Sequence, residues 1–382
     1  MRKEGRRASP PAASPGPASG APAPEAAGAA RFSPRKRFLF AVVAALLVLV
    51  AVEIGFRIVF SLSGGDAVAL KNARTFYVAD DFGIYEPWPY VGYRLSPSKA
   101  PSARAFGFQS TEPVEKAKKP GVVRLAFTGG STTWSGNALF YRGSFPYFTE
   151  GFLQKNGVPA EVMNCGNPGW TSVESLINYE LNIVDFEPDW LVIHHGVNDA
   201  PARYFPDFRS DYGHFTRPGA YEKAGLVGRV LSASDLYTWL LLVTGTVPGS
   251  VQEWLYRPLP KEEDRLLVKE GLVTFRRNTE HLIDIAEAHG ARVLLSTESH
   301  NRRPGGGREA TDVLRRAIDE SNEVLREIAR DRKLPLADTE KALDGMGAVF
   351  LDYVHVNPRG NQAKADCIGL ALLEAGIGGE RR

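Results

Sequence analysis

The sequence predicts an α/β protein, a three-layer α/β/α sandwich around a parallel five-stranded sheet, preceded by one transmembrane helix. Two patterns carry this prediction. After residue 121, short apolar runs alternate with amphipathic helical segments, which is typical of a parallel sheet covered on both faces. Near the N-terminus, a long apolar run follows a cluster of basic residues, which is typical of a membrane span.

Five apolar runs are the predicted strands. They are VVRLAF at 122–127, AEVMN at 160–164, WLVIHH at 190–195, ARVLLS at 291–296 and LPLAD at 334–338. Helix signals lie between them: Thr171 and Glu174 have the spacing of a capping box, and residues 309–332 repeat apolar side chains at helical intervals. Asn357 followed by Pro358 predicts the start of the last helix. In such a fold the active site lies beyond the carboxyl ends of the strands.

Residues 37–60 are the predicted transmembrane anchor. Phe38–Val52 is unbroken apolar sequence and the apolar character continues to the end of the segment, which is about the length needed to cross roughly 30 Å of hydrocarbon. Glu53 and Arg57 interrupt it, but residues one helical turn apart can pair or reach outward. A cleaved signal peptide is the alternative. It is disfavoured because the preceding segment is long and only residues 61–63 faintly resemble a cleavage site.

The residues before this span predict its orientation. A basic cluster precedes it directly, formed by Arg31, Arg35, Lys36 and Arg37. Because basic residues favour the cytoplasmic side, residues 1–36, mostly Ala, Pro, Gly and Ser, are predicted to be a disordered cytoplasmic tail. Everything after Phe60 is then expected to be extracytoplasmic at the cell membrane, as a single-pass protein.

The rest of the chain is predicted to be one catalytic domain, residues 121–382, with two additions. Residues 61–120 show no sustained helical or strand period and are predicted to be a connector packed on the domain. An aromatic-rich stretch at about 200–262 interrupts the strand and helix rhythm and is predicted to be an insertion, such as a lid. Within it the apolar run 236–243 has three open interpretations: cover for an acyl pocket, contact with the membrane, or a buried helix.

The composition limits the functions to consider. The net charge is +2, so there is no electrostatic reason to expect nucleic acid as a partner. Cys165 and Cys367 cannot build a disulfide framework or a cysteine-based zinc site, and two free thiols are favoured over a single bridge. His194 and His195 have no acidic or histidine partner at a ligand-like spacing, so packing or hydrogen bonding is favoured over metal binding. Neither a metal nor a cofactor is expected.

Four short segments carry the residue types of a serine hydrolase, each where the fold places catalytic loops. Ser131 follows two glycines after the first strand, and Asp352 lies three residues before His355, ahead of the last helix. Serine is a poor nucleophile unless a base takes its proton, and the base needs an acceptor that fixes its tautomer. Gly169 and Asn198 follow the second and third strands and could donate a backbone N–H and a side-chain amide to an oxyanion.

These segments resemble the signature blocks of the SGNH (GDSL-like) hydrolase superfamily, in which Ser, Gly, Asn and His stand in this order. The resemblance covers about residues 121–375 apart from the insertion, and it implies a flavodoxin-like form of the predicted sandwich. It implies a catalytic triad of Ser131, Asp352 and His355, and an oxyanion hole formed by the amides of Ser131 and Gly169 and the side chain of Asn198. The family's commonest block is Gly-Asp-Ser, so Gly130 is a departure from it.

The expected function is a serine esterase that hydrolyses an O-acyl ester, such as an O-acetyl ester, through an acyl-serine intermediate. Its substrate would be an extracytoplasmic glycan or lipid. An O-acyltransferase with the same triad is the alternative, because both reactions use the same machinery. A non-catalytic anchored binding module is less favoured, because the full set of catalytic residue types is present.

Overall fold

The computed structural model describes residues 32–78, 84–100, 105–135, 141–216, 224–247, 256–302 and 311–379. Most of the tail predicted at residues 1–36 lies outside the described residues. The chain forms two compact units, Met1–Phe60 and Ser61–Arg382.

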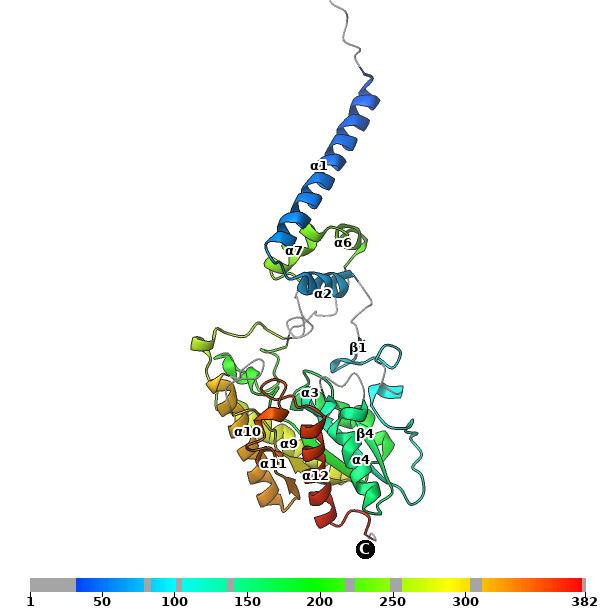
Figure 1. Cartoon of the computed structure of the whole chain (residues 1–382), viewed down its shortest axis with the longest axis vertical. Coiled ribbons are helices and arrows are strands. Elements are labelled where there is room, and N and C mark those ends of the chain that lie inside the picture. The colour runs from blue at the N-terminus through cyan, green and yellow to red at the C-terminus, as the bar shows by residue number, and fades with distance from the viewer. Residues whose placement is uncertain are drawn as a thin grey trace, which may run out of the picture. The chain divides into compact units, whose positions relative to one another are not determined.

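Helix α1 (Pro34–Leu62) contains the whole segment predicted to span the membrane (Figure 1). It is long and apolar enough to cross a bilayer, with a mean hydropathy of 2.8 over an 18-residue window, and none of its residues is buried. The Nε of Arg57 donates to Glu53 Oε1 at 2.8 Å, so the two charges in the span pair one helical turn apart, as expected. Such a helix near the N-terminus is either a membrane anchor or a signal sequence.

The core of the second unit is a parallel sheet of five strands. These are β3 (Val123–Gly129), β4 (Ala160–Asn164), β5 (Trp190–His194), β6 (Arg292–Ser296) and β7 (Leu336–Ala337). They lie in the order β4-β3-β5-β6-β7, with every neighbouring pair parallel. The chain therefore winds in opposite directions on the two sides of β3, and the carboxyl ends of β3 and β5 border the crevice where such folds bind ligands.

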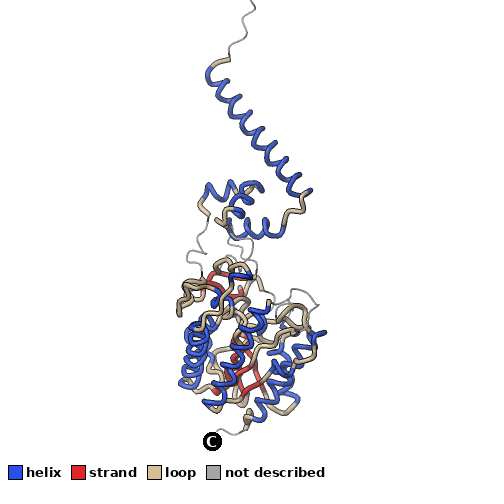
Figure 2. Tube along the Cα trace, turned by 90° about the vertical axis from the view of Figure 1, so that its left-hand side faces the viewer, coloured by secondary structure: helices blue, strands red, loops and turns tan. Residues whose placement is uncertain are grey.

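Helices cover both faces of this sheet, so the predicted three-layer α/β/α architecture is confirmed (Figure 2). The helices α4 (Phe145–Lys155) and α12 (Pro358–Glu374) pack on one face, and α5 (Ser172–Asn178), α9 (Glu270–Ala288) and α10 (Asp312–Arg332) on the other. Along β3, Leu125 and Phe127 face the first layer while Ala126 faces the second. Because both faces are buried, the strands contain consecutive apolar residues, such as 125–127 in β3 and 191–193 in β5.

The local signals for helix starts are also confirmed. Thr171 accepts from the backbone N–H of Val173, and the Glu174 side chain accepts from the backbone N–H of Thr171, which completes the predicted capping box of α5. Asn357 accepts from the first backbone N–H groups of α12, with Pro358 in its first turn.

The connector contains more regular structure than its sequence suggests. It holds α2 (Ala67–Val78), an antiparallel hairpin of β1 (Tyr85–Trp88) and β2 (Gly92–Leu95), and η1 (Ala105–Gly107). The insertion holds η5 (Pro201–Tyr204), α6 (Leu226–Leu231), α7 (Asp235–Val243) and η6 (Glu262–Asp264). Further short elements are α3 (Ser131–Trp134), η2 (Tyr141–Gly143), η3 (Tyr179–Ile183), η4 (Val184–Phe186), α11 (Thr339–Ala342) and η7 (Gly347–Val349).

An aromatic cluster joins the connector to the insertion. Its buried members include Tyr93 of β2, Trp170 of the loop after β4, and Tyr204, Tyr212 and Tyr256 of the insertion. Segments far apart in the sequence thus pack together beside the carboxyl end of β4. Cys165 and Cys367 are both free thiols.

Candidate active site

Ser131 stands at the first position of α3, directly after the end of β3. The turn between them is too tight for side chains. A β-carbon on Gly129 would lie 2.5 Å from the backbone oxygen of His194, which no real β-carbon tolerates. The glycines therefore let the chain pass from strand to helix so that the Ser131 hydroxyl lies at the carboxyl edge of the sheet.

The structure brings together the three residues predicted to form the triad. Ser131 Oγ lies 2.9 Å from His355 Nε2, and His355 Nδ1 lies 2.6 Å from Asp352 Oδ2. The second carboxylate oxygen of Asp352 accepts the backbone N–H groups of Val354 at 2.9 Å and His355 at 2.7 Å. With Nδ1 donating to Asp352, Nε2 is left to accept the proton of the serine hydroxyl, which is the arrangement that a serine nucleophile needs.

The protonation of Asp352 suits this arrangement. Its partial burial works to raise its pKa, but the hydrogen bonds from the His355 side chain and from two backbone N–H groups outweigh burial, so its pKa is below the usual value. The carboxylate therefore stays ionised at neutral pH and can stabilise an imidazolium on His355.

Asn198 packs against Gly130, the residue before Ser131, and the backbone oxygen of Trp170, the residue after Gly169, lies there as well. Asn198 Nδ2 donates to the backbone oxygen of Trp170 at 2.9 Å, and a β-carbon on Gly130 would overlap this amide nitrogen. One of the two Nδ2 hydrogens is thereby held by the Trp170 carbonyl. Among the described residues none accepts a hydrogen bond from the backbone N–H of Ser131 or of Gly169.

Two tyrosines, which the sequence analysis did not single out, hold the backbone around Gly169. Tyr93 Oη donates to the backbone oxygen of Pro168, and Tyr256 Oη donates to that of Gly169 at 2.5 Å. The Pro168 carbonyl and the Gly169 N–H belong to one planar peptide and point in opposite directions. Tyr93 therefore fixes the direction of the Gly169 N–H. The only sequence signal was the aromatic content of the connector and insertion.

A buried polar network adjoins Ser131 through its neighbour Thr132. Thr132 Oγ1 donates to Glu298 Oε1 at 2.8 Å, Glu298 Oε2 lies 2.9 Å from His194 Nε2, and Lys364 Nζ lies 3.4 Å from the same ring nitrogen. Burial works to raise the pKa of Glu298, but His194, Lys364 and Thr132 together bring it down to about 2. Glu298 comes from the loop after β6, so the acidic partner of His194 lies far from it in the sequence and not at a ligand-like spacing.

His194 and His195 both make hydrogen bonds within the core. His194 Nδ1 lies 3.0 Å from Ser296 Oγ, and His195 Nε2 lies 2.8 Å from Ser175 Oγ. Burial lowers the pKa of both rings, that of His195 to about 4. The two histidines thus serve packing and hydrogen bonding, as the sequence analysis favoured.

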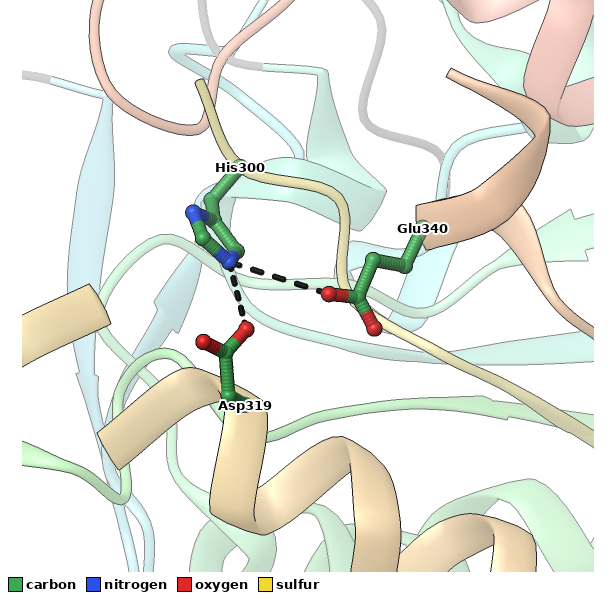
Figure 3. Close-up of side chains that lie close together, drawn as sticks. All are labelled: His300, Asp319 and Glu340. Atoms are coloured by element: carbon green, nitrogen blue, oxygen red, sulfur yellow. Dashed lines mark hydrogen bonds and ion pairs between the residues drawn. The ribbon is translucent and has the colours of Figure 1, made fainter. Parts of the chain in front are cut away.

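A second polar cluster, which the sequence did not reveal, joins His300, Asp319 and Glu340 (Figure 3). His300 Nε2 lies 2.8 Å from Asp319 Oδ1 and 3.8 Å from Glu340 Oε1. Such a group has the ligand types of a metal site. However, Arg302 pairs with both acidic side chains, and Arg326 donates to Glu340 Oε2 at 2.6 Å. The carboxylates are therefore already neutralised, and the cluster is an ion-pair network.

This ion-pair network is linked to the segment that contains Asp352 and His355. It fixes the loop after β6, in which the backbone N–H of Asn301 donates to the backbone oxygen of Tyr353 at 2.8 Å. Tyr353 lies between the two members of the triad that the last loop contributes. The loop after β6 thus contacts both sides of the site, at Thr132 next to Ser131 through Glu298 and at Tyr353 next to Asp352 through Asn301.

Comparison with known proteins identifies the family. The model of the GDSL-like Lipase/Acylhydrolase family matches residues 127–363, more than half of the 382 residues. The chain belongs to this family. The acylhydrolase is accordingly an enzyme, a carboxylic ester hydrolase, and the matched range includes Ser131, Gly169, Asn198, Asp352 and His355.

The acylhydrolase is also similar to solved structures. A catalytic mutant of Axe2, an acetylxylan esterase from Geobacillus stearothermophilus, is 18% identical with a TM-score of 0.42, over 70% of this chain and 100% of that one. LAE5, an α/β hydrolase enzyme from the metagenome of Lake Arreo, Spain, is 16% identical with a TM-score of 0.42, over 65% of this chain and 94% of that one. Among curated proteins there is no match.

Proposed function

We propose that this acylhydrolase is a membrane-anchored serine esterase with Ser131 as its nucleophile. The observation that carries the proposal is the unbroken hydrogen-bonded chain from Ser131 Oγ through the His355 ring to Asp352, with steps of 2.9 and 2.6 Å. An isolated serine hydroxyl gains nothing from such a chain, whereas a nucleophile that must lose its proton needs it.

The reaction then has two halves. His355 Nε2 takes the hydroxyl proton while Ser131 Oγ attacks the acyl carbonyl carbon, and the carbonyl oxygen becomes an oxyanion. His355 next gives the proton to the departing alcohol oxygen, which leaves an acyl ester on Ser131. Water, deprotonated by the same ring, attacks this ester, releases the carboxylic acid and restores the serine.

The oxyanion is stabilised by three donors in this proposal. They are the backbone N–H groups of Ser131 and Gly169 and the second Nδ2 hydrogen of Asn198. Donors that are fixed before the reaction cost no reorganisation when the charge develops, which is why they favour the transition state over the bound substrate. The Trp170 carbonyl and the two tyrosines supply that fixation.

We further propose that α1 remains in the membrane and that the catalytic domain is extracytoplasmic. The basic residues ahead of the span support this orientation, and the paired charges Glu53 and Arg57 are compatible with a lasting span. The substrate in this proposal is an O-acyl ester, such as an O-acetyl group, on a glycan or lipid outside the cytoplasm.

Covalent labelling with a fluorophosphonate tests the nucleophile. The Ser131→Ala variant should lose the label, while a Ser210→Ala variant, changed at an exposed serine of the insertion, should keep it. Label retained by Ser131→Ala would refute the assignment. Incubation of the labelling-competent protein with acetyl and longer acyl esters, with and without a glycan acceptor, separates hydrolysis from transfer, because only a transferase moves the acyl group to the acceptor.

A further inference from the structure

Two helices of the insertion, α6 and α7, pack against α2 of the connector. Arg74 of α2 pairs with Asp235 of α7, and its Nε donates to the backbone oxygen of Ser232 at 2.7 Å. The hydroxyl oxygens of Tyr77 and Tyr237 lie 3.4 Å apart. The helices α2, α6 and α7 therefore form one group, which we call the three-helix cluster, and they lie side by side in both views (Figures 1 and 2).

Close packing at a glycine holds α6 in the three-helix cluster. A β-carbon on Gly228 would lie 2.7 Å from Tyr77 Oη, and the backbone N–H of Ala224 donates to the Tyr77 backbone oxygen at 3.1 Å. One side of α6 thus packs on α2. This packing does not account for the residues on the opposite side of α6.

That other side is apolar and uncovered. α6 has no buried residue, and four of its six positions are large apolar side chains: Leu226 is 79% exposed, Val227 71%, Val230 67% and Leu231 45%. Two adjacent pairs one helical turn apart lie on the same side of a helix. Val68 of α2 and Val243 of α7 are exposed as well. Soluble proteins rarely leave such an apolar face in water unless it contacts a membrane or another protein.

The length of the link between α1 and α2 favours contact of this apolar face with a membrane over contact with another protein. α1 ends at Leu62 and α2 begins at Ala67, so only residues 63–66 separate them. The five Cα–Cα steps from Leu62 to Ala67 reach at most about 18 Å. If α1 spans a bilayer, α2 and the helices packed on it stay within reach of the lipid headgroups at all times. A partner from solution has no such advantage, because a tether raises the effective concentration of the tethered surface.

The charges of the three-helix cluster also suit a lipid surface. Lys71 and Arg229 are exposed, on α2 and α6 respectively, whereas the acidic side chain of α7, Asp235, is taken up by Arg74. Apolar side chains beside exposed basic ones are typical of helices that lie in the interface between headgroups and acyl chains.

We propose that the three-helix cluster is a second membrane contact, with the apolar face of α6 lying in the lipid interface. The inference rests on the proposal that α1 is a membrane anchor. It gives the insertion, to which α6 and α7 belong, a role other than a lid. The insertion would then fix where the three-helix cluster stands on the bilayer, which a single flexible anchor cannot do.

The test uses the full chain in lipid vesicles, with Cys367→Ser so that the buried Cys165 is the remaining native thiol. A polarity-sensitive fluorophore is attached at Val227→Cys on α6 or, as the matched control, at Lys155→Cys, which is exposed at the end of α4. The probe on α6 should emit at shorter wavelength and be quenched by spin-labelled lipids, and the control probe should show neither effect.

A second variant separates lipid contact from folding. With Val227→Asp and Val230→Asp, a probe at Leu231→Cys should lose both its spectral shift and its quenching. The protein should still float with the vesicles and should hydrolyse a water-soluble ester at the unchanged rate, because both valines are exposed and distant in sequence from the triad.

Three results would overturn the inference in different ways. A water-like, unquenched probe at position 227 in a protein that floats and hydrolyses ester would refute the contact and leave the anchor and the esterase standing. A shifted probe that lipid labels do not quench would mean that protein, such as a second copy, covers α6. Loss of flotation would refute the anchor and this inference together, without touching the proposed esterase chemistry.

Discussion

Gly130 and Asn198 pack so closely that a β-carbon at position 130 would overlap the Asn198 amide nitrogen. The amide is held there by the Trp170 carbonyl, which accepts from it at 2.9 Å. This gives a physical reason for the departure from Gly-Asp-Ser. In this arrangement the place of an aspartate side chain is taken by the amide that is proposed to bind the oxyanion.

Gly130→Ala should therefore behave like Asn198→Ala. Both should lower kcat by about 10²-fold with little change in KM, because a donor aimed at the developing oxyanion acts in the transition state and hardly on the bound substrate. Steady-state kinetics of the two variants and of the double variant test this. If both changes act through the same amide, the double variant is no slower than either single one. Multiplied losses would show that position 130 acts by another route.

The role of Asp352 can be separated from its place in the fold. Asp352→Asn keeps an oxygen for the backbone N–H groups of Val354 and His355, but its amide can oppose His355 Nδ1–H and favour the wrong tautomer. We expect kcat to fall by about 10⁴-fold with the melting temperature little changed. Asp331→Asn, at an exposed position of α10, is the control. A near-normal rate in a folded Asp352→Asn protein would move the acid role elsewhere.

The features that could be predicted from the sequence are those that depend on neighbouring residues. The five strands, the capping box at Thr171 and the start of α12 each depend on residues within a few positions of one another. Chain order also placed Ser131 and His355 at the same edge of the sheet, because each follows a strand or precedes a helix there.

The support around the site was not predictable in the same way. Glu298 is 166 residues from Thr132, and Tyr256 is 87 residues from Gly169. A buried glutamate and an aromatic residue in an insertion have many possible partners, and spacing selects none of them. Arg74 pairs with Asp235 and so joins the insertion to α2. The hydrophobic periodicity of the sequence does not predict this pair either.

The buried carboxyl of Asp199, next to Asn198, should make stability depend on pH. Burial raises its pKa to about 6, against the hydrogen bonds that it accepts from Ser172 and Tyr212. A pKa above the unfolded value of 3.8 means that the native state binds the proton more tightly. The contribution of Asp199 to stability is thus fully present below about pH 4 and is lost as the pH rises to about 6.

Asp199→Asn should remove this dependence. Relative to the parent protein, the variant should gain stability as the pH rises from about 4 to about 6 and show a constant difference above that. Urea unfolding midpoints at several pH values measure this, and the comparison cancels the other carboxyl groups. A difference between the two proteins that does not change with pH would mean that Asp199 ionises normally.

The connector should contribute to catalysis through Tyr93. Tyr93 Oη donates to the Pro168 carbonyl, and this carbonyl shares a peptide plane with the Gly169 N–H. Tyr93→Phe removes the donor and keeps the ring, so the peptide can rotate and its N–H no longer points steadily at the oxyanion. Since one hydrogen bond contributes about 1 kcal/mol, we expect kcat to fall roughly five- to tenfold with KM nearly unchanged. Tyr90→Phe, on the same hairpin but 81% exposed, should be silent. An increase in KM at constant kcat would instead make Tyr93 a substrate-binding residue, and equal effects of both changes would point to a general loosening of the hairpin.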